Sequence, residues 1–419
     1  MDRDIVRIEA LGRLRQCFGR GRSIAVVTVA VLLLASGAAR AGGLYLNEFA
    51  TPSMGTAGAG SEAWANSAST AGAFHNPAGM TRLEGHQLSV GAGIGNVDAE
   101  FDANANTPFG GGNGGDAAGL VPFLGSSGVL SVTDDLKLGM TVFSVAGAAL
   151  DYNNAWAGRF QAQEINLLTV SANPSIAYQV TDWLSLAGGF ILTYADLDYK
   201  LAAPPGGAGS AKIDGDDFTH GFNFGALFEL SPRTRIGVVY VSEQEIEFDG
   251  NLKINPPGLN VGSTLELDLA QAVRVGAYHE IDDQWAILGT VGWEDWSTVD
   301  SLLVNTNGGG AAIPRNWNDT YHFSIGAHYK PVEDWLLQAG FTFDTSPVDA
   351  KDRTADMPID RQIRIGLGAQ HQLSETMTVG GSVVYADLGD ARISDPNTLT
   401  GNYDTNRAVF FALNANFKF

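Results

Sequence analysis

The strongest constraint on the fold is an alternation in the last ten residues of the chain, FFALNANFKF. One face of this segment carries Phe411, Leu413, Ala415, Phe417 and Phe419, and the other carries Ala412, Asn414, Asn416 and Lys418. Successive side chains of a β-strand point to opposite faces, so the segment is predicted to be a strand with one apolar and one polar face. Such a strand fits a membrane barrel with its apolar face toward lipid, and it also fits a soluble sandwich.

The same alternation recurs in fourteen segments, and the turns between them are alternately short and long. An even number of strands with tight turns at one end and long loops at the other is typical of outer-membrane barrels. Glycine is frequent on the supposed inner face, where a lumen or a bend tolerates it. The predicted strands cover residues 87–101, 120–132, 136–150, 164–180, 183–200, 218–230, 234–250, 263–281, 285–303, 317–330, 335–345, 359–373, 376–391 and 405–419. Long loops are predicted near residues 102–118, 201–217, 250–262, 304–316, 346–358 and 389–404.

Three tryptophans relate these turns to a membrane. Trp183, Trp285 and Trp335 each begin a predicted strand directly after a short turn. They would lie at one depth, as in the aromatic girdle where indole rings sit at the level of the lipid headgroups. A soluble β-protein gives no reason for this shared placement. Residues 86–419 are therefore predicted to form an all-β, 14-stranded antiparallel transmembrane β-barrel.

Residues 1–41 have the features of a secretory signal peptide. An arginine-rich stretch precedes an apolar segment of 11 residues (24–34), which is shorter than a membrane-spanning helix. A small-x-small cleavage site ends at Ala41. Cleavage there removes Cys17, the only cysteine, so no disulfide or thiol chemistry is expected. The net charge of −21 argues against nucleic acid as a partner.

Residues 42–85 precede the first strand and lack regular periodicity. They are rich in Ala, Gly and Ser, and Pro77 within AFHNPAGMTRL (73–83) forbids a central strand position. Such a segment could hang from the barrel as a disordered tail or fold into the lumen. Barrels of 16–18 strands leave an open aqueous channel, so a selective barrel of nearly that width needs a plug.

The chain resembles the FadL-type (FadL/TodX-like) family of outer-membrane transporters for long-chain fatty acids and other hydrophobic compounds. The resemblance implies that residues 42–85 form an N-terminal hatch in the lumen, and that the barrel lies in the outer membrane of a Gram-negative cell. It covers essentially all of the chain after residue 41. The segments that carry it are Asn76-Pro77-Ala78 with Gly79 and Met80, WAGRF (156–160), NPSIAYQVTDWLSLAGGF (173–190) and VGWEDWS (291–297).

The resemblance also implies a gate and a lateral exit. The gating residues expected in the hatch are Asn76, Pro77, Ala78 and Gly79. The exit would open through the barrel wall beside an inward kink of the third strand, expected here at Val145, Ala146, Gly147 and Ala148. Gly147 permits a bulge or bend. An apolar molecule gains more from a route into the bilayer than from a watery channel.

Four cations are candidate contacts for a fatty-acid carboxylate, and a second interpretation stays open for them. They could bind the substrate, or they could pair with lumenal acids such as Glu266, Asp268 and Asp360, which the acidic composition favours. Arg274, Arg364 and Lys330 fall on the polar face of predicted strands, and Arg159 lies near the barrel mouth. The candidates are Arg159, Arg274, Arg364 and Lys330.

No catalytic motif, metal site or cofactor site is predicted, so the protein is not expected to be an enzyme. The expected function is passive uptake of hydrophobic molecules, gated by the hatch, without a choice among fatty acids, alkanes and aromatic hydrocarbons. The alternatives are a porin for small hydrophilic solutes and an adhesin or structural barrel. The expected partners are the substrate, outer-membrane lipid with lipopolysaccharide, and the barrel-assembly machinery through Phe419. A monomer is expected.

Overall fold

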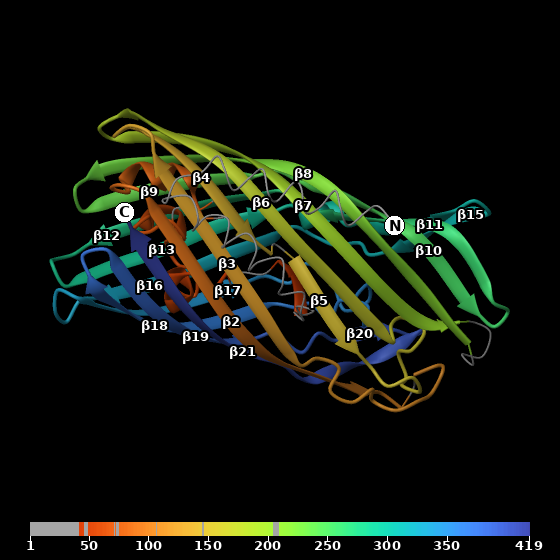
Figure 1. Ribbon diagram of the computed structural model, residues 1–419. Helices are drawn as coiled ribbons and strands as arrows, with labels where there is room; N and C mark the ends of the chain where they lie inside the picture. The colour runs from red at the N-terminus through yellow and green to blue at the C-terminus, as the bar shows by residue number, and fades with distance from the viewer. Residues whose placement is uncertain are drawn as a thin grey trace, which may run out of the picture. The chain divides into compact units, whose positions relative to one another are not determined.

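The computed structural model of this chain describes residues 42–45, 49–70, 72, 75–105, 107–144, 146–203 and 209–419. The predicted signal peptide, with Cys17, lies outside these ranges. The described strands form a closed antiparallel barrel, in which the first and last long strands lie side by side (Figure 1). The predicted 14-stranded barrel is confirmed.

The wall strands follow one another around the barrel in sequence order, and pairing of β2 with β21 closes the ring. Four of them are interrupted and carry two labels each, namely β4 with β5, β9 with β10, β11 with β12, and β13 with β14. The wall consists of β2 (Gln87–Ala103), β3 (Leu120–Ser131), β4 (Leu136–Phe143), β5 (Ala146–Asp151), β6 (Glu164–Thr181), β7 (Leu184–Ala203), β8 (Gly209–Ser231), β9 (Thr234–Val241), β10 (Gln244–Asn255), β11 (Leu259–Leu269), β12 (Ala272–Glu280), β13 (Trp285–Glu294), β14 (Ser301–Thr306), β16 (Thr320–Tyr329), β17 (Trp335–Asp344), β18 (Gln362–Ser374), β19 (Met377–Asp387) and β21 (Leu399–Lys418).

Several predicted long loops are partly strand in the structure. β8 begins at Gly209, only the turn 256–258 separates β10 from β11, and β14 forms a hairpin with β15 (Gly309–Pro314). A short strand β20 (Ile393–Asp395) also pairs with β21. These extensions escaped prediction because they carry polar side chains such as Lys212 and Asp214 where the membrane-spanning part carries apolar ones.

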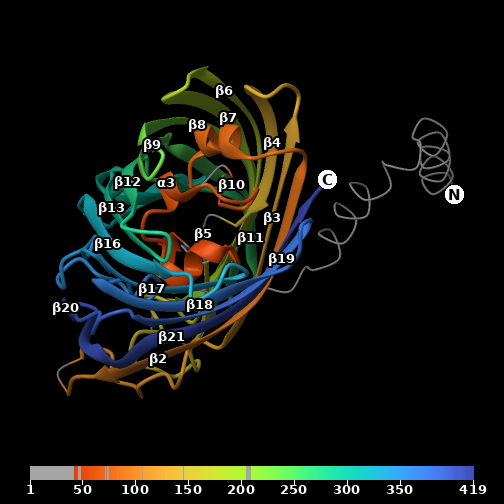
Figure 2. The same cartoon turned by 90° about the vertical axis from the view of Figure 1, so that its left-hand side faces the viewer.

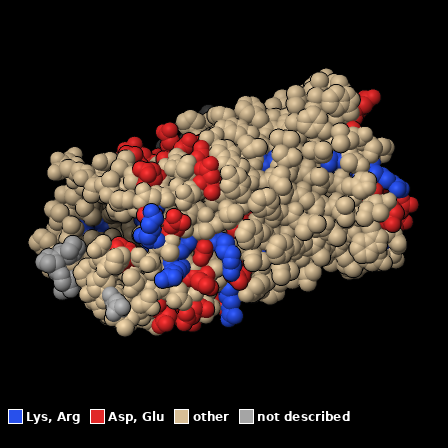
Figure 3. Space-filling view, turned by 180° about the vertical axis from the view of Figure 1, so that it is seen from behind, with Lys and Arg blue, Asp and Glu red and all other residues tan. Residues whose placement is uncertain are grey.

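The outer surface of the wall is an apolar belt. Leu413 and Ile325 are 72% and 65% exposed, and a broad surface with few charged side chains separates charged groups near the two ends (Figure 3). Such a surface would cause aggregation in water, whereas lipid covers it in a membrane. Among the described residues, no helix is long and apolar enough to cross a membrane.

The predicted girdle tryptophans lie at one end of this belt. Trp183, Trp285 and Trp335 are all roughly half exposed; Trp285 and Trp335 directly follow a short turn, and Trp183 is the last residue of one. Trp285 stacks on Tyr329 with ring centroids 4.4 Å apart. Short turns mark the periplasmic end of an outer-membrane barrel, so the opposite end is extracellular.

The segment before β2, called the hatch here, fills the periplasmic half of the lumen. It contains the short helices η1 (Pro52–Thr56), α3 (Ser61–Trp64) and η2 (Pro77–Arg82), and its first strand β1 (Gly42–Tyr45) pairs with β5. Figure 2 shows α3 and its neighbours inside the ring of strands. Nearly all described residues from 49 to 80 are buried, which fits a plug rather than a disordered tail.

Candidate functional site

Asn76 holds the turn of the hatch against the wall. Its side-chain oxygen accepts a hydrogen bond from the backbone N–H of Ala78 at 3.0 Å, which caps η2. Its side-chain amide donates to the carbonyl oxygens of Glu62 in the hatch and of Ala226 in β8, both at 2.9 Å. Pro77 occupies the first helical position, where the missing N–H costs nothing. The predicted gating turn, Asn76 to Gly79, is therefore buried between the hatch and the wall.

Glycines of the wall make room for the backbone of the hatch. A Cβ atom at Gly237 would lie 1.9 Å from the carbonyl oxygen of Glu62, and one at Gly340 would lie 2.0 Å from that of Thr56. The same close approach occurs at Gly91, whose Cβ would lie 2.0 Å from the carbonyl oxygen of Ala50. The glycines noted on the inner face in the sequence thus receive the hatch backbone.

A buried glutamate and a buried arginine complete the contact of the hatch with the wall. The Glu62 carboxylate accepts a hydrogen bond from the Thr290 hydroxyl at 2.6 Å. The Arg235 guanidinium donates to the carbonyl oxygens of Ala63 and Trp64 at the end of α3, at 3.0 and 3.3 Å. Unpaired buried groups of this kind are costly, so these contacts fix the hatch in one position.

The third wall strand is interrupted where the kink was predicted. β4 ends at Phe143 opposite Ser171, and β5 resumes with Gly147 opposite Leu168, so one extra residue bulges from the third strand. Ala146, Gly147 and Ala148 belong to β5, whereas Val145 lies outside the described residues.

The interruption also changes the pairing on the other side. β3 pairs with β4 only through residues 126–131, and no β5 partner is recorded for β3 among the described residues. The free edge of β5 pairs with β1 of the hatch instead. The wall is therefore not continuously hydrogen-bonded beside the extracellular half of β3.

A small, mainly apolar pocket lies between the hatch and β2, β3 and β4 next to this interruption. Phe49 of the hatch packs edge-to-face on Phe143, the last residue of β4, with centroids 5.9 Å apart, and on His75 at 6.0 Å. Ser127 and Thr141, which are hydrogen-bonded to each other at 3.1 Å, line the same pocket.

The extracellular half of the lumen has an apolar interior, which strand periodicity did not reveal. Its buried cluster combines residues of several wall strands with residues of loops, and Tyr152 stacks on Trp156 at 3.9 Å. Trp296 and Trp317 meet edge-to-face at 5.6 Å. Ile246 and Phe248 of β10 face inward here, whereas Glu245 and Glu247 face outward, so the alternation is the reverse of that in the lipid-facing belt.

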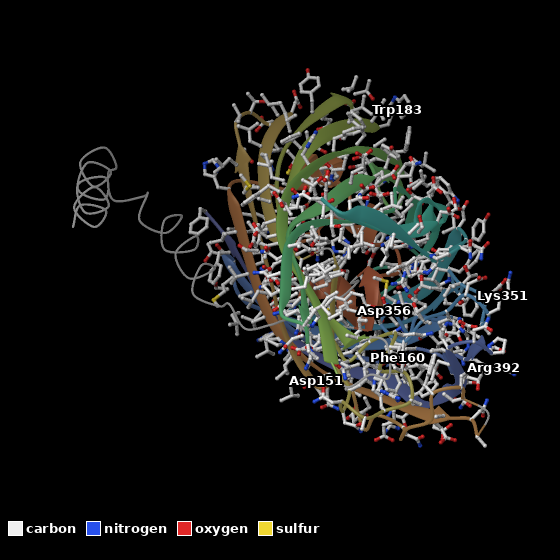
Figure 4. All side chains as sticks on the ribbon, turned by 90° about the vertical axis from the view of Figure 1, so that its right-hand side faces the viewer. Asp151, Phe160, Trp183, Lys351, Asp356 and Arg392 are labelled. Atoms are coloured by element: carbon white, nitrogen blue, oxygen red, sulfur yellow. The ribbon has the colours of Figure 1, made fainter. Side chains whose placement is uncertain are left out.

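The segment 345–361 between β17 and β18, called the cap segment here, folds into this apolar interior. Met357 and Ile359 are buried in the cluster. Asp356 lies within the ring of strands, while Trp183 is at its outer rim (Figure 4). The Asp356 carboxylate pairs in a bidentate manner with Arg315, at 2.5 and 3.0 Å, and both side chains are only 1% exposed. The sequence predicted this segment only as a long loop.

Two tyrosines hold the cap segment from the opposite side. The Tyr152 hydroxyl donates to the carbonyl oxygen of Ala355 at 2.9 Å and lies 2.5 Å from the Tyr403 hydroxyl. Burial, with the neighbouring Tyr403, raises the pKa of Tyr152 well above its usual value, so its hydroxyl keeps its proton. The cap segment is thus anchored to Arg315 and to Tyr152 within the apolar interior.

The four predicted carboxylate contacts do not converge on one place. Arg274 pairs with Glu294 at 2.7 Å, and Arg364 pairs with Asp344 at 2.5 Å. Lys330 is exposed and follows β16, so it lies at the periplasmic end of the wall.

Arg159 has no carboxylate among its recorded partners. Its guanidinium donates to the carbonyl oxygens of Gly110 and Trp156, both at 2.9 Å, and of Phe109 at 3.1 Å. It therefore ties two extracellular loops together.

The acids named as alternative partners are also different from those observed. Asp360 contacts Arg353 at 3.2 Å, whereas Arg274 and Arg364 use acids at the extracellular ends of β13 and β17. Such partners can be assigned only once the strand register is known, which sequence position alone does not give. Pairing within the lumen is nevertheless what the structure shows for both arginines.

The space below the hatch is polar. Two neighbouring cavities of about 210 and 340 Å³ share Asn66, Lys330, Leu336 and Lys418 among their lining residues. Charged side chains such as Glu280 also line them. An apolar molecule that passed the hatch here would meet a polar vestibule rather than an apolar path.

Comparisons with known proteins agree with this architecture. Residues 32–419 match the family described as outer membrane protein transport protein (OMPP1/FadL/TodX). The chain is 26% identical to the long-chain fatty acid transport protein of Escherichia coli strain K12, over 94% of this chain and 98% of that protein. It is 25% identical to the 47 kDa outer membrane protein of Pasteurella multocida, over 83% of this chain and 88% of that protein.

Solved structures show the same fold. A crystal structure of a Pseudomonas aeruginosa FadL homologue aligns with a TM-score of 0.81 at 19% identity, covering 90% of this chain and all of that one. The toluene transporter TodX of Pseudomonas putida aligns with a TM-score of 0.68 at 17% identity, covering 92% of this chain and 100% of that one. The family match spans the barrel and the hatch alike, and the chain therefore belongs to the FadL/TodX family of outer-membrane transport proteins of Gram-negative cells.

Proposed function

We propose that this protein takes up hydrophobic compounds passively across the outer membrane, and that the substrate leaves sideways through the wall beside the interrupted third strand. The relative from Escherichia coli is named as a long-chain fatty acid transport protein, and solved relatives are named as a toluene transporter and a monoaromatic hydrocarbon channel. No covalent step is part of this proposal. The porin and adhesin alternatives are not favoured by these relatives.

The interruption of the third strand is the observation that carries the proposal. The apolar interior ends toward the hatch at Phe143 and Phe49, next to the place where β3 loses its partner. The periplasmic side of the hatch offers only the polar vestibule. An apolar molecule therefore loses less on the side of the interrupted strand, where the small apolar pocket lies, than in the polar vestibule.

The hatch serves as the gate in this proposal. Movement of the turn that begins at Asn76 would break its bonds to Glu62 and Ala226 and loosen the packing of Phe49 at the pocket. The barrel acts as a monomer surrounded by lipid and lipopolysaccharide. The exposed ring of Phe419 at the end of β21 is the contact for the barrel-assembly machinery.

Filling the small pocket tests the lateral route. Thr141→Trp places an indole in the pocket, whereas Met140→Trp places the same indole on the lipid-facing side of the same strand. Uptake of labelled toluene and oleate is measured in a Gram-negative host that lacks its own transporter, with folding confirmed by heat-modifiable migration in gels. Thr141→Trp should abolish uptake and Met140→Trp should preserve it. Equal uptake by both folded variants would exclude this exit.

A further inference from the structure

Two ion pairs of β12, β13, β17 and β18 lie between the apolar interior and the hatch on this part of the ring. On the hatch side of these pairs, Thr290 and Thr342 hydrogen-bond to hatch atoms. On the other side, Trp296 and Ile359 belong to the apolar interior. A pocket at this boundary is lined by charged residues such as Glu294 and Asp344 and by apolar residues such as Trp317.

Two arginines of this boundary are already neutralised by acids of the neighbouring strands. Arg274 of β12 pairs with Glu294 of β13 at 2.7 Å, and both side chains are 11% exposed. Arg364 of β18 pairs with Asp344 of β17 at 2.5 Å, and the second Asp344 oxygen lies 2.6 Å from the His322 ring nitrogen Nδ1. Each acid is held in place by the wall, so each arginine faces a permanent counter-ion.

Both acids have a further hydrogen-bond partner besides the arginine. The second oxygen of Glu294 accepts hydrogen bonds from the Trp296 indole N–H at 2.9 Å and from the Thr320 hydroxyl at 3.2 Å. For Asp344 this partner is the His322 ring. An entering carboxylate would therefore have to displace an acid that is hydrogen-bonded on more than one side.

The same arrangement recurs on the extracellular side of the apolar interior. Arg315 is paired with Asp356, and Arg353 of the cap segment lies 3.2 Å from Asp360. The four buried arginines above the hatch, within the described part of the chain, are thus each matched by a carboxylate of the protein.

We infer that the lumen selects uncharged hydrophobic molecules over carboxylates, and that Glu294 and Asp344 are the residues that set this selectivity. The inference rests on the proposed function and narrows its substrate class. A carboxylate that enters the apolar interior loses its water and finds each buried arginine there occupied by a built-in acid. An ester, an alkane or an aromatic hydrocarbon loses only apolar hydration, which favours its burial.

A matched pair of ligands tests the inference directly. The folded protein is placed in lipid nanodiscs, and saturable quenching of tryptophan fluorescence is titrated with ω-bromododecanoate and with its methyl ester at pH 8. The two ligands share one chain and differ in charge. The methyl ester should bind about tenfold or more tightly than the carboxylate. Equal or tighter binding of the carboxylate would overturn the inference, and saturable binding of neither ligand would instead contradict the proposed function.

Two variants and a control connect the selectivity to the named acids. Glu294→Gln and Asp344→Asn each remove the negative charge that is paired with an arginine, and each should tighten carboxylate binding about tenfold while changing ester binding little. Asp283→Asn removes the acid of an exposed periplasmic pair with Arg233 and should change neither. Folding is checked by heat-modifiable migration. Two folded acid variants that bind the carboxylate as weakly as the wild type would refute the role of these acids.

Discussion

The side-chain amide of Asn76 donates a hydrogen bond to the carbonyl oxygen of Ala226, 150 positions further along the chain, at 2.9 Å. This bond joins the hatch turn directly to β8. The same amide group binds Glu62, and the side-chain oxygen caps η2. One asparagine therefore couples the local fold of the hatch to its position in the lumen.

Replacing Asn76 with alanine should loosen the hatch. The change leaves the buried carbonyls of Glu62 and Ala226 without this donor and removes the cap on Ala78, at a cost of about 1–3 kcal/mol. Hydrogen exchange of residues 75–83 should become faster. Asn96→Ala, at an exposed position of β2, is the control and should leave this exchange unchanged. Slow exchange in Asn76→Ala would show that other contacts suffice.

Gly237→Ala should displace the hatch without preventing barrel formation. The new Cβ would lie 1.9 Å from the carbonyl oxygen of Glu62, so the hatch has to shift, at a cost of about 1–3 kcal/mol. Hydrogen exchange of residues 52–64 should accelerate while heat-modifiable migration is retained. Gly128→Ala serves as the control because the nearest atom to its Cβ is 4.0 Å away. A protected hatch in Gly237→Ala would contradict this tight fit.

Removing one partner of the ion pair between Arg315 and Asp356 should destabilise the protein more than replacing both partners with apolar residues. Asp356→Asn leaves a fully buried guanidinium without its counter-ion and should destabilise the cap segment by about 3–5 kcal/mol. The double variant Arg315→Met with Asp356→Leu should be markedly less destabilised, because no charge stays buried. Hydrogen exchange of residues 345–361 measures both. The reverse order of stability would mean that the pair itself is strongly stabilising.

A charged residue on the lipid-facing surface should lower the free energy of unfolding more when it lies deeper in the membrane. Ile325 lies midway along β16 and is 65% exposed to the predicted lipid, whereas Ile281 lies at a periplasmic turn. Ile325→Arg should lower the free energy of unfolding by about 2–4 kcal/mol, and Ile281→Arg by about 0–1 kcal/mol. Urea titration in lipid vesicles gives both values. Equal losses would place Ile325 near the membrane interface.

The wall could be predicted from the sequence because lipid imposes a strict rule on it. Leu413 and Ile325 face the belt, and their strand neighbours face inward, so period-2 alternation located the strands. The tryptophans then indicated one membrane interface, and the short turns beside them indicated the periplasmic end. Beyond the membrane the outer face is no longer apolar, so the part of β8 that contains Lys212 and Asp214 was not predicted as strand.

The interior could be predicted only in part, because its contacts depend on strand register. Arg274 stands opposite Gly292, so Glu294 is its diagonal neighbour, and Arg364 stands opposite Thr342 with Asp344 in the same diagonal position. Diagonal neighbours pair readily once the register is known. The position of the cap segment could not be predicted for another reason. Met357 and Asp356 lie in a segment without regular periodicity, so no sequence pattern shows that they face inward.

The glycines of the wall shape the lumen to fit the backbone of this particular hatch. Gly91, Gly237 and Gly340 each leave a notch at the height where a hatch carbonyl arrives. A plug of another sequence and another turn would bring its carbonyls to other heights, where side chains already stand. Barrel and plug are therefore matched to each other, and a chimaera that exchanges the plug has to exchange these glycine positions as well.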